Sequence, residues 1–515
     1  MSRKTGVMLS YVLMLVQMLS TMLFTPFLIS RLGQAEYGVY SLMLSITTSF
    51  TLLDLGVGTS VVRYMSKYIT SKSSLESRKL LGVTNIYYIG ISLLALLIGI
   101  IVRAAIPTLF ATGLNEEQVE LAQRLFMITI ISTSITLATS SFSNTIIAFE
   151  KFAVSKGVSI IITILKMLLS IIALIMGCDS MGIVLVHLVT TVLTSVIYVL
   201  YVLCKLKVKP LFKDIRLSFI KEIVSYSSFV LVQTAASLII TMSGQILLGA
   251  FAKESAVIIG IFSIGTQVVQ YFKSFGSHFT SVLMPGLVRF ADSNKGRELC
   301  EKELIRISRI IFMFLSLVWV VFLFNGKSFV MLWAGEENSN AFYVAVVLMF
   351  PLLFSYSEGA GYQLIQAMAL HKIPSLVQLI SAVITVPIAI LLILWKPFEG
   401  VIIGSFITFM LCETVVMNIM YKKQLGIRLL VLFKGMFKGV VPSLIICAIS
   451  GYIMNLFSLF GNGWLQFIVN CGVMATVYGI CMLTFGMNQS EKVMLKGIVQ
   501  KLMLIFKIKL PKSRV

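Results

Sequence analysis

Five charged side chains interrupt segments of this chain that are otherwise strongly apolar: Asp54, Lys166, Lys273, Glu358 and Glu413. A charge inside the hydrocarbon of a membrane costs at least about 2.5–3.5 kcal/mol, so each is expected to face a protein interior or a wet cavity. Charges in such places would line a pathway for a polar substrate or an ion. The alternative is that a charge lies closer to a helix end than the hydropathy indicates, and both interpretations stay open.

Two arginines flank the first pair of apolar segments and offer a second kind of anion contact. Arg31 and Arg63 lie at opposite ends of these segments. They are either anchors whose charged heads reach the membrane surface or guanidinium groups that ring an entrance and bind phosphate oxygens in pairs. Among the lysines, Lys166 is the foremost candidate because it lies near the middle of its segment, and Lys273 is second.

The composition decides which elements position these residues. The 515 residues are 58% hydrophobic and 12% charged, whereas an average soluble domain has about 25% charged residues. At about 20 residues per crossing, the hydropathy predicts an all-α polytopic membrane protein with about fourteen transmembrane helices. The predicted segments are 7–30, 37–61, 81–102, 125–148, 157–177, 182–204, 223–250, 257–285, 307–325, 341–366, 375–395, 400–421, 436–459 and 464–487.

Short sequence matches between the halves predict a duplicated six-helix unit. The run YGVYS at 37–41 matches IGIFS at 259–263, and the run VRY at 62–64 matches VRF at 288–290. The copies are about 220 residues apart and begin on the same side of the membrane, which is typical of parallel repeats in transporters that rock two lobes about a central site. We therefore expect two lobes around a central cavity, two appended helices and a basic amphipathic tail, with boundaries at 1–210, 211–430, 431–487 and 488–515.

The net charge of +21 is explained by membrane topology. Roughly 34 of the 42 basic residues fall in alternate loops and at both termini, which predicts that this side, with both termini, is cytoplasmic. Nucleic acid is therefore not an expected partner. Seven scattered cysteines and three histidines form no ligand pattern, so neither a metal site nor a cofactor is predicted.

Several motifs resemble those of the Wzx-type polysaccharide flippases, within the multidrug/oligosaccharidyl-lipid/polysaccharide exporter superfamily. They are FLISRLGQAEYGVY at 27–40, LDLGVG at 53–58 with VRY at 62–64, the repeat at Gly260 and FVMLWAG at 329–335. The resemblance implies two six-helix lobes arranged as a V around a cavity. It also implies flipping of polyprenyl-diphosphate-linked oligosaccharides across the bacterial inner membrane, driven by an ion gradient, for O-antigen, lipopolysaccharide, capsule or exopolysaccharide biosynthesis.

This resemblance also implies roles and partners. Lys166, Lys273, Arg31 and Arg63 would bind the diphosphate as charge-assisted donors. The coupling cation would be carried by one of three carboxylates, Asp54, Glu358 or Glu413. Membrane lipids, a polysaccharide polymerase and a chain-length regulator are the expected partners.

Three other functions stay open. A drug/cation antiporter of the same superfamily would carry an acidic residue within its first helix, and residues 7–30 contain none. Flipping of lipid II is compatible with the same pattern. A membrane-embedded glycan polymerase or ligase would need an acid/base constellation on the outer face, where the turns offer only scattered glutamates. The sequence therefore predicts a transporter rather than an enzyme.

Overall fold

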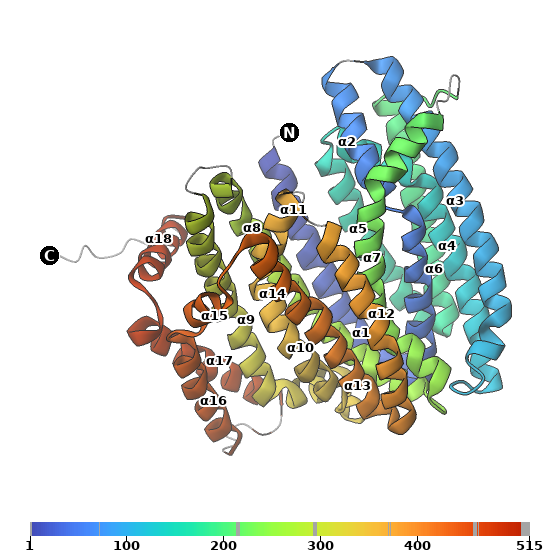
Figure 1. Cartoon of the computed structure of the whole chain (residues 1–515). Coiled ribbons are helices and arrows are strands. Elements are labelled where there is room, and N and C mark those ends of the chain that lie inside the picture. Colours follow the sequence, from blue (N-terminus) through green and yellow to red (C-terminus); the bar gives the residue numbers. More distant parts are fainter. Residues whose placement is uncertain are drawn as a thin grey trace. The chain divides into compact units, whose positions relative to one another are not determined.

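The computed structural model describes residues 3–71, 73–212, 217–291, 296–368, 370, 372–456, 461 and 463–505, which are helical throughout their ordered elements and contain no strand (Figure 1). The α-helices are α1 (Arg3–Ser49), α2 (Val57–Thr70), α3 (Ser74–Leu109), α4 (Glu116–Ala148), α5 (Phe152–Ile175), α6 (Asp179–Leu200), α7 (Leu217–Phe251), α8 (Ala256–Ala291), α9 (Gly296–Ala334), α10 (Ala341–Ser357), α11 (Gly359–Ala367), α12 (Lys372–Trp395), α13 (Pro397–Thr408), α14 (Val416–Met420), α15 (Leu429–Phe437), α16 (Val440–Leu456), α17 (Trp464–Cys481) and α18 (Gln489–Ile505).

Short irregular turns link several of these helices. Two are 3₁₀ segments, η1 (Phe50–Asp54) and η3 (Glu336–Asn338). Four are π-helical: η2 (Tyr201–Lys205), η4 (Phe409–Val415), η5 (Tyr421–Leu425) and η6 (Met482–Gly486). π-Helical turns are rare and frequently occur at functional sites. Two of these segments, η1 and η4, lie inside the predicted spans 37–61 and 400–421, and the other four lie near the ends of predicted spans.

Within the described part of the chain, eleven helices are long and apolar enough to cross a membrane, and two bent pairs raise the total to thirteen. The longest, α1, has 47 residues and contains a non-helical residue at Gly33, with φ 75° and ψ 170°. A straight helix of that length would be about 70 Å long, more than twice the hydrocarbon thickness, so the break at Gly33 separates two spans. The prediction of an all-α polytopic membrane protein with about fourteen spans is confirmed.

The chain forms two compact units. Unit 1 comprises Met1–Tyr271, Trp333–Pro351 and Ala369–Met417, and unit 2 comprises Phe272–Leu332, Leu352–Met368 and Asn418–Val515. The predicted boundaries near residues 210, 430 and 487 were drawn from sequence repeats, whereas the two units are defined by how compactly the chain folds. The two-lobe organisation stays a prediction. The tail predicted as a helix is helical at α18, and residues 506–515 lie outside the described part.

In unit 1 the two glycines that the repeat pairs with each other lie at a helix crossing. A Cβ atom built on Gly38 of α1 would overlap the carbonyl oxygen of Ala256 at the start of α8. Reciprocally, a Cβ atom on Gly260 of α8 would lie 2.6 Å from the carbonyl oxygen of Gln34. The two helices therefore touch backbone to backbone, as small residues permit in membranes. The exchange of equivalent contacts is what a two-fold relation between repeats produces.

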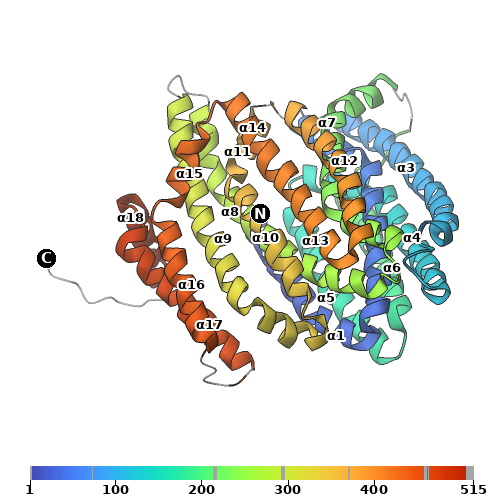
Figure 2. The same ribbon diagram turned by 60° about the horizontal axis from the view of Figure 1, so that its bottom comes forward.

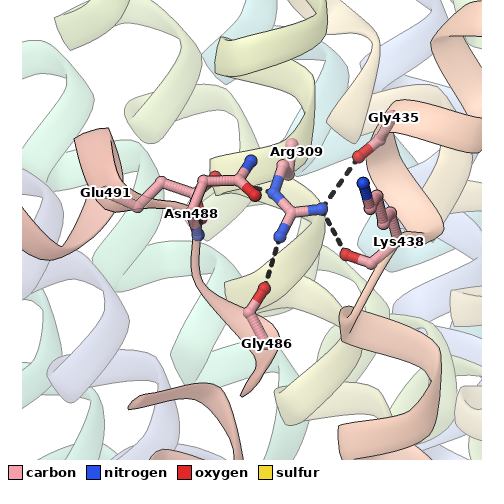
Figure 3. Close-up of polar contacts among 6 residues, drawn as sticks. All are labelled: Arg309, Gly435, Lys438, Gly486, Asn488 and Glu491. Atoms are coloured by element: carbon pink, nitrogen blue, oxygen red, sulfur yellow. Dashed lines mark hydrogen bonds and ion pairs between the residues drawn. The ribbon is translucent and has the colours of Figure 1, made fainter. Parts of the chain in front are cut away.

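In unit 2 the C-terminal helices are joined to α9 by one buried arginine, shown in Figure 3. The guanidinium of Arg309, 3% exposed, donates from Nε to the Glu491 carboxylate at 2.7 Å. It also donates to the carbonyl oxygens of Gly435 at 2.9 Å and Gly486 at 2.6 Å, and to that of Lys438. These groups come from the end of α15, the end of η6 and the first turn of α18. α16 and α17, which lie in the chain between Lys438 and Gly486, pack side by side (Figures 1 and 2).

Candidate functional site

Unit 1 contains a cavity of about 540 Å³ between α1, α5, α6 and one residue of α8. This size falls within the range typical of small-molecule sites. Its lining combines hydroxyl groups, two side-chain amides and aromatic rings with one lysine and one histidine. The polar and aromatic members are Gln17, Ser20, Thr21, Phe24, Thr25, Tyr37, Tyr40, Ser41, Thr163, Lys166, Ser170, His187, Thr190, Thr191, Thr194 and Gln267.

Lys166 of α5 lines this cavity and pairs with a histidine of α6. Its Nζ lies 3.0 Å from Nδ1 of His187. Because an ammonium group can only donate, Nδ1 accepts and the neutral ring carries its proton on Nε2. No Asp or Glu is among the described residues that line the cavity, so the lysine charge has no counterion there. The arrangement suits an anionic ligand.

A network of amide and hydroxyl groups holds the other wall. Nε2 of Gln267 donates to Oγ1 of Thr25 and to the hydroxyl of Tyr271, each at 2.8 Å. The hydroxyl of Tyr37 donates to Oε1 of Gln267 at 3.5 Å. On the α5 side, one helical turn after Lys166, Ser170 contributes a buried Oγ with no hydrogen-bond partner in the described structure. Hydroxyls, amides and aromatic faces of this kind match a polyhydroxylated ligand, whose own hydroxyls both donate and accept.

The lining of the unit 1 cavity includes one of the four predicted anion-binding residues. Lys166 lines the cavity, whereas Lys273 is buried on the part of α8 that belongs to unit 2. Arg31 is exposed on α1, with its guanidinium carbon 5.6 Å from the centroid of the Phe27 ring. Arg63 is exposed on α2. The roles of these three residues stay predictions.

His187 is the site residue that the sequence analysis missed. It lies inside the predicted segment 182–204, where a lone histidine is as unusual as a lone lysine. Its separation from Lys166 is 21 residues, which becomes a contact only when α5 and α6 pack side by side as hairpin partners. The signal was therefore the presence of a polar side chain in an apolar segment, and the pairing itself required the fold.

Asp54 lies at a break between η1 and α2. Its Oδ1 accepts a hydrogen bond from the hydroxyl of Tyr88 at 2.6 Å, and Nδ2 of Asn144 donates to the same hydroxyl at 3.4 Å. The two residues after it, Leu55 and Gly56, have positive φ values of 53° and 71°. The carboxylate therefore ties the turn to α3 and α4, which supports the interpretation that Asp54 stabilises a break.

Removal of the Tyr88 hydroxyl tests this tie. We expect Tyr88→Phe to destabilise the protein by about 1–2 kcal/mol, because Asp54 loses its donor in a partly buried position. The neighbouring Tyr87 is a matched control, since its buried hydroxyl has no hydrogen-bond partner in the described structure. Tyr87→Phe should leave the apparent melting temperature in detergent unchanged or slightly raised. Equal losses in the two variants would contradict a specific role for the contact to Asp54.

The remaining two carboxylates differ in burial. Glu358, between α10 and α11, is 2% exposed and its Oε2 accepts from Nδ2 of Asn418 at 2.8 Å. Glu413, in η4, is partly exposed. Neither of them lines the cavity of unit 1. Their role in cation coupling stays a prediction.

Comparison with known proteins places this site in a family. A family model described as "Polysaccharide biosynthesis protein" matches residues 4–291, which include every residue of the cavity. The chain belongs to the polysaccharide biosynthesis protein family. A comparison with curated protein sequences gives no match.

Several solved structures have a fold similar to that of this chain. It is similar to the lipid II flippase MurJ in an inward closed conformation, with a TM-score of 0.70, 14% identity, and coverage of 93% of this chain and 97% of MurJ. An inward-facing multidrug resistance MATE family transporter aligns with a TM-score of 0.57 and 16% identity, and the alignment covers 79% of this chain and 95% of the transporter. A MATE transporter from Vibrio cholerae aligns with a TM-score of 0.57 and 15% identity, and the alignment covers 82% of this chain and 98% of the transporter. At these identities the likeness establishes the fold alone.

Proposed function

We propose that the protein flips polyprenyl-diphosphate-linked oligosaccharide repeat units across the bacterial inner membrane, supplying surface polysaccharide biosynthesis. The observation that carries the proposal is the lining of the unit 1 cavity, which offers hydroxyls, amides, aromatic rings and the ammonium of Lys166, with no carboxylate among its described residues. The hydroxyl groups of a sugar would form hydrogen bonds with the hydroxyl and amide groups of the lining. The anionic linkage balances the lysine charge.

The same lining favours this substrate class over the main alternative. A drug/cation antiporter binds positively charged molecules, which need a carboxylate to offset their desolvation. The described residues of this cavity instead present a cation. A glycan polymerase is disfavoured because the similar solved structures are transporters, with MurJ described as a flippase.

The cavity volume suits only part of an oligosaccharide. The lipid tail of such a substrate would remain in the bilayer, because its apolar surface is more stable in hydrocarbon than in a polar cavity. Lys273, Arg31 and Arg63 would contribute charge along the path of the diphosphate, outside the cavity itself. Both termini would be cytoplasmic, as the distribution of Lys and Arg indicates. A polymerase and a chain-length regulator would act on the units after they reach the outer leaflet.

Lys166→Ala tests the proposal. The purified protein is reconstituted in liposomes that carry a fluorescent polyprenyl-diphosphate oligosaccharide in the inner leaflet, and an impermeant quencher added outside reports flipping. A charge-assisted hydrogen bond contributes about 1.5–3 kcal/mol, so we expect flipping to slow about 10- to 100-fold. Lys166→Arg, which keeps the charge, should retain part of the activity.

Lys396→Ala is the matched control, because this lysine is 55% exposed and lies outside the cavity. It should leave flipping unchanged. The proposal is overturned if wild-type protein does not flip the substrate with or without an ion gradient. Drug efflux coupled to a cation in the same liposomes would then establish the antiporter. Flipping that is insensitive to Lys166→Ala would place the substrate outside this cavity.

A further inference from the structure

The first helix of unit 1 contains a proline in its interior. Pro26 lies inside α1 and has no backbone N–H, so the regular helical hydrogen bond from residue 26 to the carbonyl oxygen of Met22 cannot form. Within a membrane, a carbonyl group freed in this way is costly unless a neighbouring group donates to it. The Met22 carbonyl oxygen therefore needs a donor from outside the regular helix.

A tryptophan from another helix supplies that donor. Nε1 of Trp333, next to the last residue of α9, donates to the Met22 carbonyl oxygen at 2.7 Å. Trp333 is 5% exposed and belongs to unit 1, as Met22 does. An indole nitrogen can only donate, and here its N–H replaces the one that Pro26 lacks. The FVMLWAG motif at 329–335, which the proposed function does not use, therefore places a donor against α1.

The same short segment contacts α1 a second time. Nε2 of Gln34 donates to Oδ1 of Asn338, a fully buried residue, at 3.0 Å. Between the two contacting residues of this segment the chain turns at Gly335, whose φ of 99° glycine adopts at little cost. Residues 333–338 therefore hold α1 on both sides of its two irregular positions, the proline and the break that follows it.

The turn of α1 that Trp333 holds also forms a wall of the unit 1 cavity. The lining residues on either side of Met22 are Thr21, Phe24 and Thr25. Oγ1 of Thr25 accepts from Nε2 of Gln267 at 2.8 Å. This turn is thus held by α8 through a side chain and by α9 through the backbone. Because groups at a binding site must be fixed to within about 0.5 Å, the position of this wall depends on both contacts.

We propose that Trp333 is a positioning residue of the unit 1 cavity: its indole replaces the donor that Pro26 removes and fixes the α1 wall that binds the glycan. The proposal rests on the proposed function, because it takes this cavity as the substrate site. Trp333 is not among the described residues that line the cavity, so it acts on the substrate through α1. Without its N–H the Met22 carbonyl group would have to find another partner, and the lining groups of the same turn would move with it.

A double-mutant cycle with Pro26 tests the proposal, because alanine at that position restores the missing N–H. Flipping of a fluorescent polyprenyl-diphosphate oligosaccharide in proteoliposomes is measured at a series of substrate densities. Trp333→Phe keeps an aromatic ring and loses the donor. We expect it to raise the half-saturating density about 10-fold, the loss of one hydrogen bond whose acceptor stays buried. The maximal rate should change little, because the lost contact serves binding. In the Pro26→Ala background the same substitution should change the half-saturating density less than about two-fold.

Hydrogen–deuterium exchange of the full chain without substrate measures this contact independently of transport. Trp333→Phe should accelerate exchange of the backbone amides of residues 22–32 about 10-fold, and Pro26→Ala should suppress the acceleration. Gln34→Ala removes the other contact and should accelerate exchange in both backgrounds, because the alanine at position 26 gives it no substitute. Trp395→Phe is the matched control and should change neither readout, since Trp395 is 70% exposed on the same unit.

Equal effects of Trp333→Phe with proline and with alanine at position 26 overturn the proposal, because the ring would then act by its bulk alone. An unchanged half-saturating density in Trp333→Phe overturns the positioning role even where exchange accelerates. Poor folding of Trp333→Phe supports the proposal if Pro26→Ala corrects it and contradicts the proposal if it does not. If wild-type protein flips no glycan lipid while exchange shows the corrected acceleration, the role of Trp333 toward α1 is supported and the proposed substrate is overturned.

Discussion

Arg309→Ala is expected to release the C-terminal helices of unit 2 and to cost about 3–5 kcal/mol of stability, the range for breaking a buried ion pair by removing one partner. The variant leaves Glu491, 5% exposed in its side chain, as a buried carboxylate without its cation. It also leaves the carbonyl oxygens of Gly435, Lys438 and Gly486 without their donor. The apparent melting temperature in detergent and limited proteolysis around residue 488 measure the two effects.

The control for this prediction is an arginine one turn earlier on the same helix. Arg306 pairs with Glu303 at 3.5 Å, but its side chain is 45% exposed, so Arg306→Ala should cost less than about 1 kcal/mol. Glu491→Gln should fall between the two variants, because it keeps an oxygen acceptor and loses the charge. Equal melting temperatures for Arg306→Ala and Arg309→Ala would show that the four contacts of Arg309 do not hold the tail.

The hydropathy of the sequence was sufficient to predict the helical class and the approximate spans. Apolar length is a local property, and a bilayer converts it directly into a spanning helix. Lys166 could be predicted as a site residue on the same basis, since a lysine in the middle of a span needs a polar environment. The break at Gly33 falls in the gap between the predicted segments 7–30 and 37–61. The break at Glu358 was not visible, because the predicted segment 341–366 is apolar on both sides of it.

Contacts between residues distant in the sequence could not be predicted. Arg309 and Glu491 are separated by 182 residues, and no local pattern in the sequence pairs them. His187 and Tyr88 could be recognised only from their contacts with residues of other elements, Lys166 and Asp54. One pattern that identified repeats also identified a contact, since the glycines of the two matched motifs pack together.

The contact between Gly38 and Ala256 is the basis of the second large loss of stability that we expect. Gly38→Ala would place a Cβ atom on the carbonyl oxygen of Ala256, a backbone group with no rotamer to change. The helices α1 and α8 must then separate along their crossing, and we expect a cost of at least about 3 kcal/mol, the upper end for overpacked interiors. Gly260→Ala, 2.6 Å from the Gln34 carbonyl oxygen, should be less severe. The fraction of monodisperse protein after a heating series ranks the variants.

Gly90 of α3 provides the opposite case on the same unit, because nothing lies within 4 Å of the position its Cβ atom would take. Alanine there removes the entropic cost of a helical glycine, so Gly90→Ala should leave the protein as stable or raise its stability by about 0.5–1 kcal/mol. The expected order of stability is Gly90→Ala above Gly260→Ala above Gly38→Ala. If Gly38→Ala and Gly90→Ala melted at the same temperature, the close backbone contact at Gly38 would be contradicted.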